Sequence, residues 1–330
     1  MERVRISDIA EELGLSTATV SNVIHGKTGK VSPETVRRVQ ETLEKRRYIP
    51  SMAGILLAQN DSRIIGVVMN DHEKYQGHLL EDPFIAASLN ALAAEIDRCG
   101  LFMMVKATRD TAAIIRFASM WNLEGMVLIG FCQEDYQLLR DQMHIPFVVY
   151  DGYLEDPRGI CNLTLDNFDG GFQVGQYFRN LGHRRALCIA DNNICMDRER
   201  WEGFTAGFGA ADFWQIPMER EERLRFYEEH LEALMQYTAV FAVSDYYAAD
   251  LMRFLQPKGI SVPEQISVAG FDDAPICGQI VPALTSVRQD GALRARLALE
   301  KLEAMKAGDE TGSTLRLPVI LIVRQSVRSL

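Results

Sequence analysis

Apolar and polar positions follow two different patterns along the chain. From residue 64 onward, apolar runs of five or six residues are separated by longer amphipathic stretches such as FIAASLNALAAEIDRCG. The runs are IIGVVM, LFMMV, GMVLIG, PFVVY, ALCIA, VFAVS and ISVAGF. Strands that alternate with helices build parallel sheets covered on both faces, and seven or more such units are too many for one small sheet. The pattern predicts an α/β fold with two doubly wound parallel-sheet subdomains.

This architecture also predicts where a ligand binds. In open α/β sheets, ligands lie beyond the carboxyl ends of the strands, so the expected site is the cleft between the two subdomains. The sequence offers no catalytic set, because we find no G-x-S-x-G, no Walker loop and no H-E-x-x-H, and the six histidines have no evident partner. We therefore predict a ligand-binding protein and not an enzyme.

The first 47 residues follow the period of helices instead. Ser7 is the expected N-cap of a first short helix, and Gly14 is its expected C-terminal stop. Ser16 is the expected N-cap of a second helix after a three-residue turn, which makes a helix-turn-helix, and Ser32 with Pro33 begins a third. The apolar positions expected to turn inward are Ile9, Ala10, Leu13, Val20, Val23, Ile24, Val36, Val39 and Leu43.

The second helix, within LSTATVSNVIHGK, is unusually polar. Ser, Thr and Asn are mediocre helix formers, so their presence needs another reason. With the apolar positions inward, four side chains project outward near the helix N-terminus: Thr17, Ala18, Ser21 and Asn22. A recognition helix touches base edges in the major groove with this part. A plain helical bundle is the alternative, and the polar outward face favours DNA binding.

Charge narrows the choice of partner. The 330 residues carry a net charge of −10 at pH 7, which argues against nucleic acid as a partner of the whole surface. The charge is uneven, however: residues 1–60 hold 9 Lys+Arg and 7 Asp+Glu, a net +2, which leaves 26 against 38, or −12, for residues 61–330. Only the N-terminal segment is compatible with a polyanion.

Composition excludes several classes of protein. The six cysteines show no C-x-x-C pair and no histidine at zinc spacing, so we expect buried reduced thiols and neither a metal nor a cofactor. No apolar run approaches the ~18 residues of a membrane span, and the charged start MERVRISDIAEE is unlike a secretory signal. We expect a cytoplasmic protein without a membrane partner.

The run RISDIAEELGLSTATVSNVIHGKTGKVSPETVRRVQETLEKRRYIP resembles the DNA-binding headpiece of the LacI/GalR repressors. The likeness rests on the helix spacing, the T-V-S of the second helix, the V-S-x-x-T that opens the third, and the closing Y-I-P. Asn22 stands where the family usually has Arg, and His25 where it usually has Asn. The resemblance implies DNA contacts from Ser16, Thr17, Ala18, Thr19, Ser21, Asn22, His25 and Thr35.

Residues 50–61 form the expected hinge between a DNA-binding domain at 1–49 and an effector-binding and dimerisation domain at 62–330. In the resembling family this place holds a helix that folds on operator DNA and wedges a leucine into the minor groove, and Leu57 matches that leucine. The alternative is that Leu57 and its apolar neighbours pack on the large domain.

Further segments resemble the family in order, among them RERWEGF, SDYYAADLMRFLQPKGISVPEQISVAGFDD and PALTSVRQD. The family's effector domain is similar to the type I periplasmic sugar-binding proteins, with three crossovers between its subdomains. The resemblance implies that subdomain one holds residues 62–162 and 289–318, and that subdomain two holds residues 163–288 and 319–330.

The same resemblance implies an effector site formed by Phe84, Asp151, Asp166, Arg200 and Asp272. Carboxylates and Arg fix vicinal hydroxyls through charge-assisted hydrogen bonds, while an aromatic face covers the apolar side of a sugar. Two alternatives stay open: Arg200 and Asp272 as an ion pair between subdomains, and Phe84 as part of the core.

Two functions remain. The first is a DNA-binding transcriptional regulator that binds double-stranded operator DNA as a homodimer or higher oligomer and responds to a small sugar or sugar derivative; the resemblance implies repression. The second is a sugar-binding component of a transport system. A transport component needs export, and because no signal peptide is evident, the headpiece favours the regulator.

Overall fold

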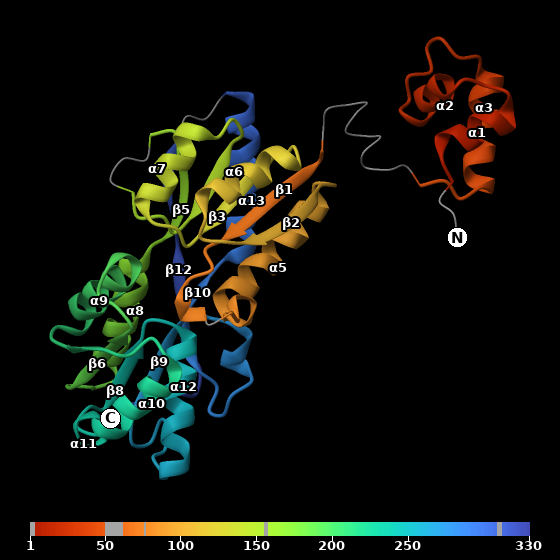
Figure 1. Ribbon diagram of the computed structural model, residues 1–330. Helices are drawn as coiled ribbons and strands as arrows, with labels where there is room; N and C mark the ends of the chain where they lie inside the picture. The colour runs from red at the N-terminus through yellow and green to blue at the C-terminus, as the bar shows by residue number, and fades with distance from the viewer. Residues whose placement is uncertain (1–3, 50–61, 76, 155–157, 309–311) are drawn as a thin grey trace. The chain divides into compact units, whose positions relative to one another are not determined.

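The structure, a computed structural model, describes residues 4–49, 62–75, 77–154, 158–308 and 312–330 (Figure 1). It divides into two compact units, Met1–Ser62 and Arg63–Leu330. Leu57 and the rest of the expected hinge before Ser62 lie outside the described residues. Of the helices in the described part, none combines the length and apolar character that crossing a membrane requires.

The first unit contains three helices, α1 (Ile6–Leu13), α2 (Thr17–Ile24) and α3 (Pro33–Lys45). Ile9, Val20 and Val39, one from each helix, are fully buried and pack together. α1 ends at Gly14, whose φ of 66° is a left-handed conformation that glycine adopts without strain. The prediction of three helices around a shared apolar core is confirmed.

Two of the three predicted helix caps are confirmed. Ser16 and Ser32 each accept a hydrogen bond from the backbone N–H three residues further on, at 3.1 and 3.2 Å. The prediction for α1 was wrong, because this helix begins after Arg5, whose N–H donates to the carboxylate of Asp8 (2.8 Å). Ser7 lies inside the first turn and bonds the same carboxylate. An ionised carboxylate accepts more strongly than a hydroxyl, so Asp8 and not Ser7 sets the start.

The first sheet of the second unit has six parallel strands in the order β11-β5-β4-β3-β1-β2. Residues of β1 alternate between its faces: Ile65 and Val67 join the cluster of α5 and α13, while Ile64 and Val68 join that of α6 and α7. The elements are β1 (Ile64–Met69), η1 (Glu73–Tyr75), η2 (Leu79–Glu81), α5 (Pro83–Arg98), β2 (Phe102–Ala107), α6 (Thr111–Met120), β3 (Gly125–Ile129), α7 (Gln133–Gln142), β4 (Phe147–Tyr150), β5 (Cys161–Leu165), α13 (Gly291–Ala307) and β11 (Ser313–Leu317).

The second sheet also has six strands, in the order β12-β10-β9-β8-β6-β7, and only β12 runs antiparallel, against β10. Its elements are α8 (Asn167–Asn180), β6 (Ala186–Ala190), α9 (Cys195–Phe208), β7 (Asp212–Gln215), α10 (Arg220–Glu229), α11 (Leu231–Leu234), β8 (Ala239–Ala242), α12 (Asp245–Leu255), η3 (Gln256–Lys258), β9 (Ser267–Asp272), η4 (Pro275–Gly278), β10 (Thr285–Gln289) and β12 (Val319–Ile322). The predicted α/β class with two parallel-sheet subdomains is confirmed.

The chain passes between the sheets three times, and the first passage differs from the expected boundary after residue 162. β5 pairs with β4 and β11 through residues up to Leu165, so all of this strand belongs to the first sheet and the passage follows it. The second passage follows β10, whose last residue, Gln289, pairs with Val319 in the second sheet. A boundary placed inside a strand would break its hydrogen-bond ladder, which is why the passages occur in the connections.

Helices α8 and α9 lie side by side (Figure 1), and their backbones are in direct contact. Four glycines make the contact possible, because a Cβ on any of them would collide with a backbone carbonyl of the facing helix. They are Gly171 and Gly175 in α8, and Gly203 and Gly207 in α9. The two helices thereby lock into one register against the second sheet, where α8 contacts β12 and α9 contacts β6.

We predict that Gly203→Ala lowers the free energy of unfolding by about 1–3 kcal/mol or more, because the methyl group would force the two backbones apart. Gly278→Ala is the control, since a Cβ there meets no atom within 4 Å. Denaturant titrations of both variants measure the effect. Equal stability of the two variants would contradict the close helix contact.

Candidate functional site

A cleft of about 540 Å³ lies between the carboxyl ends of the two sheets. Four of the five predicted effector residues line it, namely Phe84, Asp151, Arg200 and Asp272. Phe84 and Asp151 belong to the half built on the first sheet, and Arg200 and Asp272 to the half built on the second. Parallel strands bring these positions together because their carboxyl ends meet at one edge of each sheet.

Asp166, the fifth predicted residue, does not line this cleft. It lies directly after β5 and is the N-cap of α8, where its carboxylate accepts the N–H of Asp169 (3.0 Å). An Asp in this position stabilises the start of a helix. Its observed contact is therefore with the first turn of α8, where the chain passes from the first sheet to the second.

Arg200 lies in α9 and is almost completely buried, with 7% of its surface exposed. Its Nε donates to Oδ1 of Asn167 (2.8 Å), and its Nη1 donates to the carbonyl of Val243 (2.6 Å). The guanidinium also stacks on the ring of Phe271, 3.6 Å from the ring centroid. These contacts hold the side chain at the wall of the cleft, and they take the place of the ion pair with Asp272 that was the alternative.

Asp272 ends β9 with a φ of 115°, a backbone conformation that residues other than glycine rarely adopt. Its Oδ1 accepts a hydrogen bond from Nε2 of Gln289 (3.0 Å). Burial raises the pKa of Asp272 well above its usual value, and the charge of Asp245 adds to the shift, while the Arg200 guanidinium opposes it. This carboxyl can therefore offer a ligand both a donor and an acceptor.

The strained turn after Asp272 is held by Asp245, which the sequence analysis missed. Asp245 begins α12 and is fully buried. Its Oδ2 accepts the N–H of Ala274 (2.7 Å), and its Oδ1 accepts the hydroxyl of Ser286 (2.5 Å). One carboxylate thus ties α12, β10 and the turn together, which fixes the position of Asp272.

Asp151 shares its buried site with a residue that the sequence analysis also missed. Its Oδ2 lies 2.7 Å from Nη2 of Arg294 in α13, and the two side chains are 6% and 2% exposed. The buried stripe of α13 includes Ala298 and Leu302, and Arg294 lies four residues before Ala298 on the same stripe. A charge among the buried positions of a helix was the signal that could have identified it.

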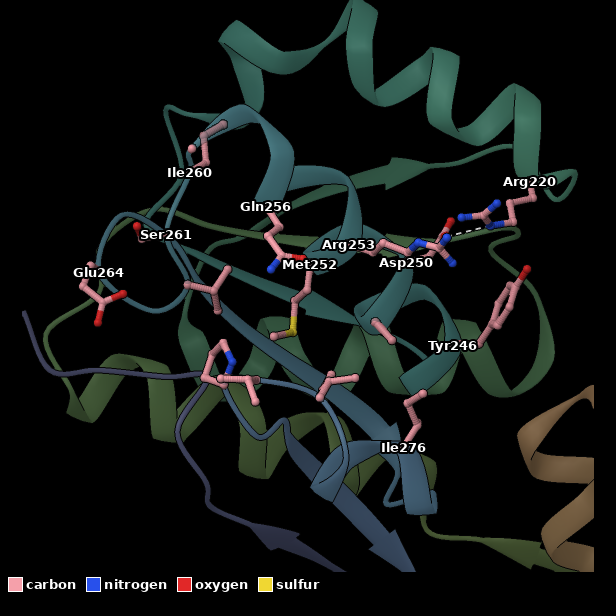
Figure 2. Close-up of a pocket in the computed structure, with 16 residues that line it drawn as sticks. Arg220, Tyr246, Asp250, Met252, Arg253, Gln256, Ile260, Ser261, Glu264 and Ile276 are labelled. Atoms are coloured by element: carbon pink, nitrogen blue, oxygen red, sulfur yellow. Dashed lines mark hydrogen bonds and ion pairs between the residues drawn. The ribbon is translucent and has the colours of Figure 1, made fainter.

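A second hollow, of about 830 Å³, lies on the subdomain of the second sheet, around α12 (Figure 2). The ion pair between Arg220 and Asp250, with 2.9 Å between the atoms, lies at one end of it. Arg220 and Tyr246 line both this hollow and the cleft. None of the predicted effector residues lines the hollow, so the cleft is the candidate effector site.

In the first unit, α2 presents the polar face that the sequence predicted. Thr17, Ala18 and Asn22 are exposed, and Ser21 is half-buried. The turn after α2 adds positive charge, because Lys27 is exposed and forms no ion pair with a described residue.

The other predicted DNA contacts are partly engaged within the unit. The hydroxyls of Ser16 and Thr19 lie 2.8 Å apart, and Thr35 forms the same contact with the cap of α3. His25 is the half-buried C-cap of α2. Leu57 lies outside the described residues, as stated above.

Two known families match separate parts of the chain. Residues 5–51 match "Bacterial regulatory proteins, lacI family", and residues 176–327 match the "Periplasmic binding protein-like domain". The HTH-type transcriptional repressor PurR of Mannheimia succiniciproducens is 25% identical over 341 residues, which cover 98% of this chain and 99% of that protein.

Two solved structures have the same fold. The Lac repressor dimer bound to operator and an anti-inducer gives a TM-score of 0.84 at 21% identity and covers 99% of this chain and 100% of that one. The complex of the transcriptional regulator CelR with cellobiose gives a TM-score of 0.69 at 24% identity and covers 98% of this chain and 100% of that one.

We predict that ionisation of Asp245 destabilises the protein. Burial raises the pKa of Asp245 to about 6, so between about pH 4 and pH 6 the folded state keeps a proton that the unfolded state has lost. The contribution of Asp245 to the free energy of unfolding therefore falls as pH rises through this window, by at most about 1.4 kcal/mol per pH unit, and levels off above it. Asp245→Asn, which has no charge to gain, should remove this slope.

Urea titrations at pH 5, 6 and 7 measure the effect. Asp97→Asn, which changes an exposed carboxylate of α5, is the control that should keep the slope of the wild type. Parallel stability curves for the wild type and Asp245→Asn would contradict the prediction.

Proposed function

Because the chain belongs to the LacI family of bacterial regulatory proteins, we propose that this DNA-binding transcriptional regulator is a repressor controlled by a small sugar-like effector. The observation that carries the proposal is the combination of two sites in one chain. α2 presents an exposed polar face at its N-terminus, and a separate unit contains a cleft lined by carboxylates, Arg200 and Phe84. We place the protein in the cytoplasm, where the operator DNA is.

We propose that the DNA-bound form is a homodimer on a nearly palindromic operator. One headpiece with a net charge of +2 offers few phosphate contacts, whereas two of them double the contacts and fix the spacing of the half-sites. The Lac repressor structure, which is a dimer bound to operator, supports this arrangement. PurR, named as a repressor, supports repression over activation.

The proposed effector site is the cleft, with Phe84, Asp151, Arg200 and Asp272 as ligand contacts. Carboxylates and a guanidinium bind vicinal hydroxyls, and the ring of Phe84 can cover the apolar side of a sugar. The CelR structure contains cellobiose, which supports a sugar as the class of effector. Asp166 is proposed to support the site indirectly, because it caps the start of α8 where the chain leaves β5.

The switch is proposed to act through residues 50–61. Closing the cleft changes the relation of the two subdomains and hence the spacing of the paired hinges, each with Leu57 as the proposed minor-groove wedge. A sugar-binding component of a transport system is the second function considered from the sequence. The headpiece argues against it, because a transport component has no use for an exposed recognition helix.

We predict that Asn22 reads an A·T pair. Asn can bond N6 and N7 of adenine bidentately, and its side chain is exposed in α2. Asn22→Ala should cost about 1–3 kcal/mol per half-site and relax the preference at one base pair, while Asn22→Arg should shift that preference toward G·C. Selection from randomised operators with the wild type and both variants measures the effect.

Thr19→Ala is the matched control, because its hydroxyl pairs with Ser16 and is proposed to position the helix on phosphate. This variant should weaken binding to all sequences alike. If all four proteins select the same base at this position, the proposed contact of Asn22 is wrong.

We predict that Arg200→Ala and Asp272→Ala abolish the response to effector and leave operator affinity within about twofold. The effector should change operator affinity of the wild type by about 5–150-fold, the usual range of allosteric coupling. Fluorescence anisotropy of a labelled operator, with and without each sugar that raises the melting temperature, measures both quantities. Arg198→Ala is the control, since this exposed residue of α9 pairs with Glu202 outside the cleft. A normal response of both cleft variants would show that the effector binds elsewhere.

A further inference from the structure

Tyr150, Asp151 and Arg294 form a buried cluster beside the cleft. Arg294 is 2% exposed, and its Nη2 contacts Oδ2 of Asp151 at 2.7 Å and the carbonyl of Leu163 at 2.6 Å. Its guanidinium lies over the ring of Tyr150, 4.0 Å from the centroid, and 5.9 Å from that of Phe84. Asp151 and Phe84 line the cleft, so the cluster adjoins the proposed effector site.

Four polar atoms of this cluster are buried and have no hydrogen-bond partner in the part of the chain that the structure describes. They are Oδ1 of Asp151, the hydroxyl of Tyr150, and Nε and Nη1 of Arg294. Folded proteins rarely leave such atoms unpaired, because each has lost its water without a replacement. Their concentration in three neighbouring side chains indicates a place that is completed by a group from a ligand.

The chemistry of the four atoms selects the kind of group. Asp151 Oδ1 can only accept, both Arg294 nitrogens can only donate, and the Tyr150 hydroxyl can do either. A hydroxyl group fits, since it donates to Asp151 and accepts from Arg294 or Tyr150. A phosphate would be repelled by the negative charge of Asp151, and an ammonium group would be repelled by the positive charge of Arg294.

We propose that Tyr150, Asp151 and Arg294 form a subsite for one uncharged hydroxyl of the effector, and that Arg294 makes the cleft select neutral sugars over phosphorylated and amino sugars. This inference rests on the proposed function, because it names the class of sugar that the same cleft binds.

Two of the other cations at the cleft, Arg220 and His78, agree with this selection, because each is paired with a carboxylate. Arg220 pairs with Asp250 at 2.9 Å, and Arg200 donates to Asn167 and to a backbone carbonyl. His78 pairs with Glu81 at 2.8 Å. Further carboxylates line the cleft, namely Asp82, Asp191 and Asp197. Among the described lining residues, a phosphate would therefore find several carboxylates against one arginine, Arg200, that pairs with no described carboxylate.

Matched sets of sugars test the proposal. Glucose, galactose, ribose and cellobiose are each compared with their amino and phosphate derivatives by isothermal titration calorimetry. Protection of Cys195, which lines the cleft, from alkylation locates the binding, in a Cys99→Ser/Cys132→Ser background that removes the two exposed thiols. For a sugar that protects Cys195, we expect the neutral form to bind at least tenfold more tightly than its amino and phosphate derivatives.

Two variants should change this preference in opposite directions. Arg294→Met leaves Asp151 as an uncompensated acceptor, so the ratio of amino-sugar to neutral-sugar affinity should rise at least tenfold. Asp151→Asn leaves Arg294 uncompensated, so the ratio of phosphate to neutral affinity should rise at least tenfold. A merely structural role of Arg294 would weaken all ligands equally and leave both ratios unchanged.

Arg296→Met is the matched control, since this exposed residue of the same helix faces Glu300 and should alter neither affinity nor preference. If Arg294→Met does not fold, the double variant Asp151→Asn/Arg294→Met, which buries no unpaired charge, should lose tenfold or more of the discrimination against charged sugars. Tighter binding of a phosphate or amino derivative by the wild type, or unchanged ratios in the variants, would overturn the subsite and leave the sugar effector standing. If no sugar of the panel protects Cys195, the sugar effector and the subsite are both wrong.

Discussion

Backbone contact between α8 and α9 is the constraint on which the cleft depends. Four glycines let the helices touch, and the contact fixes α9 against a helix that begins where the chain has just left the first sheet. α9 carries Arg200, which reaches Asn167 in α8, the carbonyl after β8 and the ring of Phe271 in β9. A shift between the helices would therefore move the guanidinium away from all three partners together. The position of Arg200 in the cleft therefore depends on the four glycines between α8 and α9, which lack side chains.

The two cleft carboxylates share a second constraint, which is backbone strain. Asp151 has a φ of 52° and Asp272 a φ of 115°, and each lies where a strand ends. Such conformations persist only where surrounding contacts hold them. Arg294 supplies that support on one side of the cleft, and Asp245 with Gln289 supplies it on the other. Each half of the cleft thus holds a carboxyl group at the cleft wall with buried polar partners.

The sequence predicted what depends on local patterns and missed what depends on distant partners. Each of the seven apolar runs overlaps a strand, whereas five strands were not predicted: β5, β7, β10, β11 and β12. Polar residues interrupt the first four, as in CNLTL, DFWQ, TSVRQ and STLRL, and the fifth, VILI, is only four residues long. The caps at Ser16 and Ser32 were predictable from three or four residues. The partners of Arg294 and Asp245 were not, because they lie far along the chain. Asp166 was predicted as a cleft residue, and its observed contact is a local one, the N-cap of α8.

The distribution of charge connects the two units in function. Residues 61–330 carry −12, so this part of the protein repels a polyanion, and the attraction to DNA comes from a headpiece with a net charge of only +2. A single headpiece that is so weakly charged binds poorly, and affinity then depends on two headpieces acting together. Joint action is sensitive to their spacing, because a second contact gains from the first only if the geometry allows both. A neutral effector that changes this spacing can therefore control DNA affinity without adding charge or touching DNA.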